Sequence, residues 1–229
     1  MFARISHYVK RTFQILSKGK WKEVLGKIQK TLQREIVKSR LANIYCKGQG
    51  IEIGGAEHNS FGLKTLNVDY TNELTVFKLE EVRTCGSYMP VDIVAAGDNI
   101  PVTDESFDFV INSHVLEHFL DPMKALLEWY RIVKKGGIIF MIVPHKERTF
   151  DKERPRTTLK ELIERHAGIT DLKQETYEHF SVWITQDLLE LIIYMNNSGI
   201  FPKPVIIEAI QDVDDKVGHG FTVVLRKQL

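Results

Sequence analysis

Residues 111–122, INSHVLEHFLDP, hold the side chains of this chain whose types and spacing most clearly suit chemistry. His114, Glu117 and His118 spell H-x-x-E-H, the order found in an inverted class of zinc metalloproteases. Positions i, i+3 and i+4 share one face of a helix, where two imidazoles and a carboxylate can hold a metal ion. The alternative is that these residues follow a strand and lead into a helix, facing some other ligand.

The elements that position this segment alternate between strands and helices. Short apolar runs predict strands over residues 51–53, 65–70, 91–96, 107–112, 138–144, 205–210 and 221–227. Stripes of apolar residues predict helices over residues 73–84, 122–135, 158–166 and 185–197. On the first helix Leu74, Phe77 and Val82 are candidate core positions, and Gly136-Gly137 is a candidate C-cap of the second.

This alternation predicts an α/β fold with a doubly wound, mostly parallel sheet of seven strands. The last two strands are separated only by the short loop QDVDDKVGHG, so we expect them to form an antiparallel hairpin. In such sheets a ligand binds at the carboxyl ends of the strands. The segment after the strand at 107–112 is therefore expected at the ligand-binding edge.

The charge is divided unevenly along the chain. Residues 1–47 contain 12 Lys or Arg and 2 Glu, a net of +10, whereas the other 182 residues contain 19 Lys or Arg and 28 Asp or Glu, a net of −9. Apolar residues at steps of three and four make 1–47 a basic amphipathic helical arm. We expect it to dock on an anionic membrane surface, or to pack against the body or a second copy in a dimer. Nucleic acid is not expected, because no RNA-binding signature is present.

The remaining composition favours a cytoplasmic protein, docked at most peripherally on the inner membrane face. The two cysteines, Cys46 and Cys85, cannot form a disulfide framework and lack Cys-x-x-Cys spacing. No apolar run approaches the roughly 18–20 residues that a transmembrane helix needs. Residues 48–229 are expected to form the domain that carries the ligand-binding edge. Within it, the polar segment 145–182 is expected to be an insertion that covers this edge.

Four blocks, IEIGGAEHN, LNVDY, AAGDNIPVTDESFDFVINSHVLEHF and KKGGIIFMIVP, occur in order at suitable intervals. Together they resemble class I S-adenosylmethionine-dependent methyltransferases, over residues 51–145 and more loosely to 227. The resemblance implies a Rossmann-like domain that binds S-adenosyl-L-methionine. It also implies the cofactor-binding residues, which are Glu52, Gly54, Gly55, Asp69, Gly97, Asp98, Asn99 and Ser113.

Elementary chemistry supports several of these assignments. Gly54 and Gly55 allow close backbone approach to a ligand. Asp69 ends the second strand, where a carboxylate accepts hydrogen bonds from two ribose hydroxyls; its alternative role is that of a turn or capping residue.

Two departures from the family pattern stand out. Only residues 54–65 separate the first two strands, which leaves little room for the helix that usually connects them. His58 and Asn59 lie in this short connection, where they either contact the cofactor or form a turn. The acid expected at Ala96 is absent, and Asp98 is its candidate replacement.

Methyl transfer to an oxygen needs an aligned acceptor and a base for its proton. Histidine suits that task because its pKa lies near neutrality. His145 and His118 are the candidate bases, and His179 lies in the covering segment. A divalent metal on His114, Glu117 and His118, with His145 or His179 completing the shell, is the less favoured interpretation. Arg148 and Arg154 bind an anionic acceptor or belong to a solvated charge run.

The acceptor is not specified by these motifs alone. The block PHKERTFDKERPRTTLKEL and the basic arm resemble methyltransferases of bacterial surface-polysaccharide assembly. We therefore expect a sugar or a lipid-linked glycan as acceptor. Two alternatives stay open: a small quinone-like acceptor, and a non-catalytic adaptor, membrane-docked or dimerising, with a vestigial cofactor pocket.

Overall fold

The structure is a computed structural model that describes residues 39–173 and 179–229. The basic arm predicted over residues 1–47 therefore lies outside the described residues up to Lys38. The compact unit that contains the sheet begins at Ser39. Its first helix, α3 (Arg40–Tyr45), starts where the Ser39 side chain accepts the Ala42 N–H at 3.0 Å. Ala42 and Cys46 are buried against the sheet, so the end of the predicted arm is part of the sheet domain.

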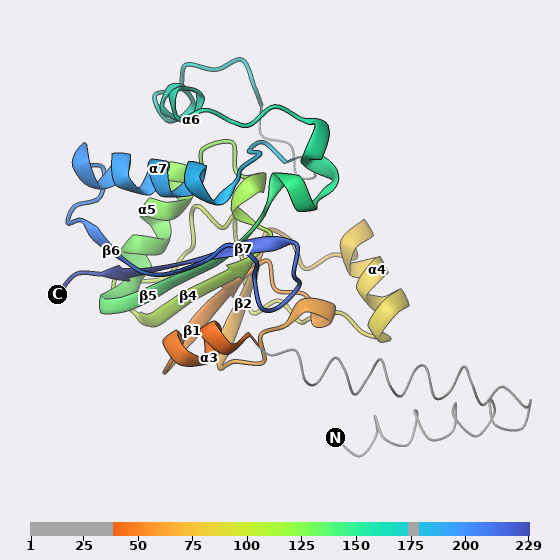
Figure 1. The fold of residues 1–229 in the computed structure, drawn as a ribbon. Coiled ribbons are helices and arrows are strands. Elements are labelled where there is room, and N and C mark those ends of the chain that lie inside the picture. Colours follow the sequence, from red (N-terminus) through yellow and green to blue (C-terminus); the bar gives the residue numbers. More distant parts are fainter. Residues whose placement is uncertain (1–38, 174–178) are drawn as a thin grey trace, which may run out of the picture. The chain divides into compact units, whose positions relative to one another are not determined.

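The centre of the domain is one sheet of seven strands in the order β3-β2-β1-β4-β5-β7-β6. β1 to β5 run parallel to one another, while β7 runs antiparallel to both β5 and β6. This confirms the Rossmann-like fold and the C-terminal hairpin (Figure 1). The strands are β1 (Gly50–Ile53), β2 (Thr65–Asp69), β3 (Ile93–Val94), β4 (Phe107–Ser113), β5 (Val133–Pro144), β6 (Val205–Gln211) and β7 (Gly220–Lys227).

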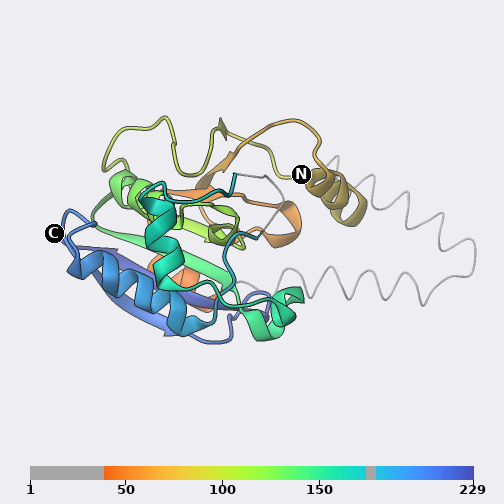
Figure 2. The ribbon, with the colours of Figure 1, turned by 90° about the horizontal axis from the view of Figure 1, so that it is seen from above.

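Helices cover both faces of this sheet. α5 (Pro122–Ile132) and α7 (Thr185–Asn197) lie on one face and α3 lies on the other (Figure 1). Seen from above, α6 (Leu159–His166) lies over the same face as α5 and α7 (Figure 2). The first crossover, between β1 and β2, contains only the 3-10 turn η1 (Glu57–Asn59), as its short length predicted.

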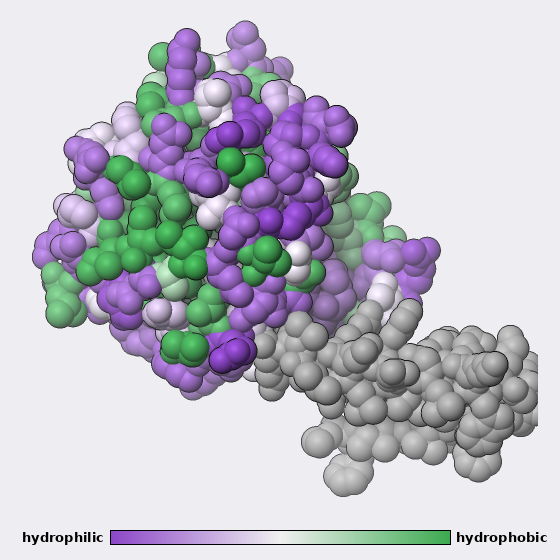
Figure 3. All heavy atoms as spheres, viewed as in Figure 1, coloured by the Kyte–Doolittle hydropathy of each residue, from purple (hydrophilic) through white to green (hydrophobic). Residues whose placement is uncertain are grey.

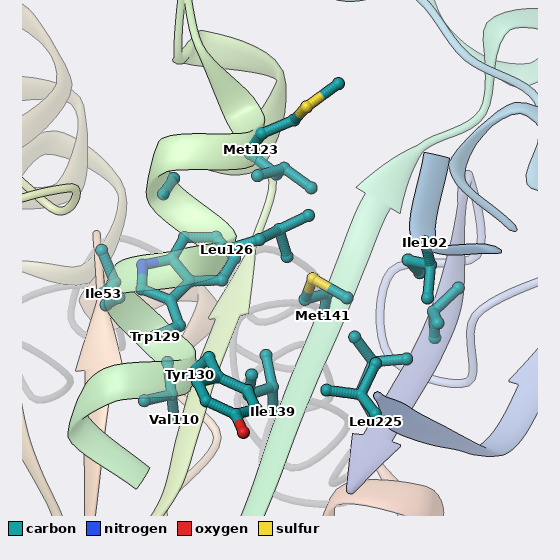
Figure 4. Close-up of a cluster of buried hydrophobic side chains, with 14 of the residues drawn as sticks. Ile53, Val110, Met123, Leu126, Trp129, Tyr130, Ile139, Met141, Ile192 and Leu225 are labelled. Carbon is teal, nitrogen blue, oxygen red and sulfur yellow. The ribbon is translucent and has the colours of Figure 1, made fainter. Parts of the chain in front are cut away.

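The main hydrophobic core lies between α5 and the central strands. α5 starts where the Asp121 side chain accepts the Lys124 N–H at 3.0 Å, with Pro122 in the first turn. Met123, Leu126 and Trp129 are 0% exposed. They project toward β5 and its neighbours, as Figure 4 shows for Leu126 and Met141. Burying each such side chain contributes about 1.5–3 kcal/mol, so this face fixes α5 on the sheet.

The predicted C-cap at Gly136-Gly137 is wrong. α5 ends at Ile132 and β5 begins at Val133, so both glycines lie inside a strand. Gly136 has φ +76°, and a Cβ on Gly137 would lie 2.8 Å from the Lys134 carbonyl oxygen. The two glycines let the backbone bend within the strand, where a side chain would collide.

The predicted core face of the helix near 73–84 is also wrong. α4 spans Val76–Cys85, and Leu74, Phe77 and Val82 are 56%, 52% and 38% exposed. Lys78 and Glu81 are buried instead. The Glu81 carboxylate accepts the backbone N–H of Glu57 at 2.8 Å and of Met89 at 3.0 Å. The buried face of α4 is thus polar because it serves backbone groups of neighbouring loops.

Exposed apolar side chains gather near the edge strand β6. Ile206 and Ile210 on β6 are 45% and 48% exposed, and Ile193 on α7 is 50% exposed. Figure 3 shows apolar atoms together on this side of the domain, among a mostly hydrophilic surface. Within residues 39–173 and 179–229, no helix has the length and apolar character that crossing a membrane requires.

Candidate functional site

The loop after β1 has glycines where side chains do not fit. Gly54 has φ +63°, and a Cβ there would lie 2.8 Å from a methyl group of Val115. A Cβ on Gly55 would lie 2.7 Å from Oδ1 of Asn67, which accepts the Gly55 N–H at 3.0 Å. The loop therefore presents bare backbone, as close approach of a ligand requires. The contact with Val115 places the segment after β4 directly beside this loop.

Glu52 lies in β1 just before these glycines. It is 2% exposed, and the Thr65 hydroxyl donates to its Oε2 at 3.2 Å. Burial raises the pKa of Glu52, while Thr65 and the charge of Lys216 oppose that rise. Burial also lowers the pKa of Lys216 to about 8. Glu52, the acid that the resemblance implies here, is thus buried. Its neighbours are Thr65 of β2 and Lys216 of the β6–β7 loop.

Asp69 is at the carboxyl end of β2, where the ribose-binding acid is expected. Its side chain is 17% exposed, and its Oδ2 lies 3.2 Å from Nζ of Lys78 on α4. Lys78 also donates to the Thr71 carbonyl oxygen. The carboxylate is therefore held in place from one side while part of it stays accessible. Lys78 was not predicted from the sequence, because the apolar stripe of α4 was expected to be its buried face.

The loop after β3 is fixed through Gly97. The indole N–H of Trp129 donates to the Gly97 carbonyl oxygen at 2.8 Å. A Cβ on Gly97 would lie 2.8 Å from Cγ2 of Ile53 and 2.9 Å from Cζ of Phe119. Only a glycine fits between these side chains. The core helix α5 thus sets the position of the loop through a buried hydrogen bond.

Asp98 and Asn99 continue this loop. The Asn99 N–H donates to the Ala96 carbonyl oxygen at 3.0 Å and closes a turn. The Asp98 carboxylate lies 2.8 Å from Nζ of Lys124 on α5, with its side chain 21% exposed. In this structure Asp98 faces a lysine of α5. A role as replacement for the acid missing at Ala96 therefore requires it to share or leave that ion pair.

These strand ends fit a nucleoside cofactor that carries a sulfonium. Bare backbone at Gly54 and Gly55 can approach the ligand, and Asp69 offers a carboxylate with an accessible edge. The hydrogen bond from Trp129 to the Gly97 carbonyl oxygen holds the loop after β3 at the same edge of the sheet. Ligands of doubly wound sheets bind at this edge, where the predicted cofactor residues converge.

The end of β4 has an unusual backbone at His114, whose φ is +58°. Its Nδ1 lies 3.1 Å from the Ser113 hydroxyl, which also accepts from the Asn59 side chain at 3.2 Å. Its Nε2 lies 3.1 Å from Nδ1 of His219. Burial lowers the pKa of His114 to about 4, and the nearby His219 adds to this effect. His114 is thus neutral at neutral pH and turned toward the β6–β7 loop.

The H-x-x-E-H residues do not share one helix face. Leu116–His118 form a single 3-10 turn, η2, and α5 begins only at Pro122. Glu117 and His118 instead form a group with His179 of the covering segment, and one ligand atom from each lies within 4.8 Å of the others. The helical premise for a site that includes His114 is therefore wrong, while Glu117 and His118 do lie together.

Glu117 is the most deeply buried member of this group. It is 0% exposed, and burial raises its pKa to about 8, with the charge of Asp151 adding to the rise. Its Oε1 lies 3.8 Å from Nε2 of His118 and 4.0 Å from Nε2 of His179. Without a nearby cation, this carboxyl is largely protonated at neutral pH.

Asp151 and Arg154 orient His179. Its Nδ1 lies 2.7 Å from Oδ2 of Asp151, which is 2% exposed. Arg154 donates to the other Asp151 oxygen at 2.6 Å and to the His179 carbonyl oxygen at 2.7 Å. Asp151 therefore holds the proton of His179 on Nδ1 and leaves Nε2 as an acceptor directed at Glu117. Asp151 was not predicted from the sequence, because it lies within the charged run KERTFDKERPR.

His145 lies in a different polar group. Its Nδ1 accepts the Glu147 N–H at 3.2 Å, and its Nε2 lies 3.9 Å from Oδ1 of Asp212. Asp212 also pairs with Arg148 at 3.2 Å. Burial lowers the pKa of His145, which is 8% exposed. The two candidate bases thus have different partners, and only His118 lies in the Glu117 group.

The chain is similar in sequence to several known proteins. A family described as a methyltransferase domain matches residues 47–141. The uncharacterized protein MJ1123 of Methanocaldococcus jannaschii is 30% identical over 180 residues, which cover 76% of this chain and 78% of that protein. A Mycolicibacterium smegmatis protein named "Probable S-adenosylmethionine-dependent methyltransferase" is 29% identical over 122 residues, which cover 50% of this chain and only 45% of that protein.

A solved structure shows the same fold. An S-adenosylmethionine-dependent methyltransferase of Methanosarcina mazei aligns with a TM-score of 0.50 at 13% identity, covering 83% of this chain and 98% of that chain. The family match includes β1, β2 and β4 with the loops that carry Gly54, Asp69 and Gly97. The chain therefore belongs to the same family as the M. jannaschii protein, and its residues 47–141 match a methyltransferase domain.

Proposed function

We propose that this methyltransferase methylates an oxygen of a sugar, in a free or lipid-linked glycan, with His118 as the base. The bound cofactor supplies the electrophilic methyl group. The observation that carries the proposal is the cluster of Glu117, His118 and His179. Glu117 and His118 follow Val115, the residue next to Gly54 of the glycine loop. A hydroxyl is a poor nucleophile until its proton is removed, so two imidazoles beside the cofactor edge favour an oxygen acceptor.

His118 is better suited to this role than His145. The His118 side chain is 29% exposed, so an acceptor can reach it. The ring of His179 lies against it, with the ring centroids 4.7 Å apart. In neutral His145 the Nδ1 lone pair already accepts a backbone N–H, which leaves the proton on Nε2. His145 therefore lacks a free lone pair for the acceptor's proton.

A neutral, hydroxyl-rich acceptor fits better than an anionic one. The two arginines that could have bound a phosphate are engaged, Arg148 with Asp212 and Arg154 with Asp151. The resemblance of the block after β5 to methyltransferases of surface-polysaccharide assembly supports a glycan. The basic arm of residues 1–47 supports docking at a membrane where lipid-linked glycans are found.

The test uses the full chain, cofactor labelled in its methyl group, and a panel of acceptors. The panel contains lipid-linked oligosaccharides, simple glycosides, a quinol and a primary amine. We expect label in a methyl ether on a sugar. His118→Asn should then lower kcat by about 10²–10⁴-fold, the usual contribution of a positioned base. The Kd for S-adenosylhomocysteine should not change, and His166→Asn, on the surface of α6, serves as the control.

Label on the quinol or on the amine alone would contradict the proposed acceptor. A His118→Asn variant with wild-type kcat would contradict the proposed base. The His166→Asn control excludes a general effect of losing one histidine near the covering segment.

A further inference from the structure

The ligand atoms of Glu117, His118 and His179 are spaced nearly as the ligands of one metal ion are. Oε1 of Glu117 lies 3.8 Å from Nε2 of His118 and 4.0 Å from Nε2 of His179. These separations are too long for hydrogen bonds. Atoms that bind one ion at about 2.0–2.2 Å stand roughly 3–4 Å apart, so a small contraction would bring all three onto a common ion.

The buried carboxyl group of Glu117 lacks the hydrogen-bond partners that such a group normally has. It is 0% exposed, and neither carboxylate oxygen has a hydrogen-bond donor from another described residue. Buried polar atoms in folded proteins are nearly always satisfied, by protein groups, by water or by an ion. The backbone around Glu117 is well tied, because its carbonyl oxygen accepts the Phe180 N–H at 2.8 Å. The backbone at Glu117 is therefore fixed, and the carboxyl group faces His118 and His179.

The hydrogen-bond partners of His179 are those that metal-binding histidines usually have. Such histidines usually donate their other ring N–H to a carboxylate, which fixes the tautomer and the ring. Asp151 takes this position toward His179 at 2.7 Å, and Arg154 in turn fixes Asp151 at 2.6 Å. Nε2 of His179 is thereby left as a ligand atom that faces Glu117.

We propose that Glu117, His118 and His179 bind one divalent transition-metal ion such as Zn²⁺. Two imidazoles and one carboxylate suit Zn²⁺, Co²⁺ or Fe²⁺, whereas Mg²⁺ and Ca²⁺ prefer sets of oxygens. Three protein ligands leave a coordination position open. An acceptor hydroxyl binds the ion at this open position. This use of the site rests on the proposed function.

The ion changes where the proton of the acceptor goes. Coordination lowers the pKa of the hydroxyl, so its proton leaves to water. The oxygen then forms the O–CH₃ bond as the sulfonium C–S bond breaks. The part of the proposed function kept here is the methylation of an acceptor oxygen. His118 is a ligand in the ion-loaded protein, so its role as a base applies only to the ion-free protein, and experiments on the two forms separate the roles.

The test titrates the full chain, stripped with a chelator and dialysed, with Co²⁺ followed by visible absorption and with Zn²⁺ in a calorimeter. We expect one ion per chain, with no competition from millimolar Mg²⁺. Glu117→Gln and His179→Gln should each weaken binding by about 100-fold or more. Asp151→Asn should weaken it by about 10–100-fold, as loss of the carboxylate that orients a metal-binding histidine does. His166→Gln keeps wild-type affinity, and thermal unfolding confirms that each variant is folded.

Absence of binding, or equal binding by Glu117→Gln and the wild type, would overturn the inference. The proposed function is judged separately. If the stripped protein methylates a glycan at full rate and binds no ion, the metal site fails while the function stands. If Co²⁺ binds at Glu117 but no acceptor oxygen is methylated, the function fails while the site stands.

Discussion

Replacing Asp69 with alanine lowers the affinity for S-adenosylhomocysteine by tens-fold or more. The carboxylate lies at the end of β2 with its side chain 17% exposed, and we expect it to accept hydrogen bonds from two ribose hydroxyls. Hydrogen bonds to a charged acceptor contribute about 1.5–3 kcal/mol each. Losing even one of these hydrogen bonds weakens the affinity by more than about tenfold. Isothermal calorimetry on the full-length variant measures the change directly.

The control must separate cofactor binding from folding. Asp69 also neutralises Lys78, which is 3% exposed, so the alanine variant leaves a buried ammonium without this partner. The double variant Asp69→Ala with Lys78→Met removes that charge and should recover stability but not affinity. Asp171→Ala, at an exposed acid, should leave affinity unchanged. Wild-type affinity in Asp69→Ala would refute the ribose assignment.

Replacing Trp129 with alanine lowers the free energy of unfolding by about 3–5 kcal/mol, the usual cost of emptying a large buried site. Trp129 is 0% exposed in the main core, where Figure 4 shows it beside Ile53. Its ring packs edge-on against Phe119, with ring centroids 6.1 Å apart. Its indole also donates to Gly97 in the loop after β3. Urea denaturation of the domain measures the loss.

Trp129→Phe is the matched variant, because it keeps a ring in the core and removes the indole N–H. Leaving the Gly97 carbonyl without its donor costs about 1–3 kcal/mol. The loop that carries Gly97 should also shift, so affinity for S-adenosylhomocysteine falls in this variant as well. An alanine variant no less stable than the phenylalanine variant would contradict the packing role of Trp129.

The sheet was predictable because its signals are local. Apolar runs such as 138–144 have the period and length of buried strands, and the short loop before β7 allows only an antiparallel return. The glycines at 54 and 55 and the acid at 69 are placed by strand ends, which a sequence pattern fixes to within a residue or two. The alternation of elements therefore predicted both the fold and the cofactor edge.

The acceptor side was less predictable because it depends on contacts between distant segments. His179 meets Glu117 across 62 positions of sequence, and Asp151 orients it from within a run of charges that looks solvated. The apolar stripe of α4 was misleading for a related reason. Periodicity ranks apolar residues as buried, whereas Lys78 and Glu81 are buried because they satisfy Asp69 and the backbone amides of loops.

Titrating the full chain with S-adenosylhomocysteine in a calorimeter tests the cofactor site most directly. We predict one site per chain with a Kd on the order of micromolar. Ligand at about 100 times Kd should then stabilise the folded protein by about 2.7 kcal/mol and raise its Tm. The absence of both binding heat and thermal shift would contradict the assignment of the edge formed by Gly54, Asp69 and Gly97 as a methyl-donor site.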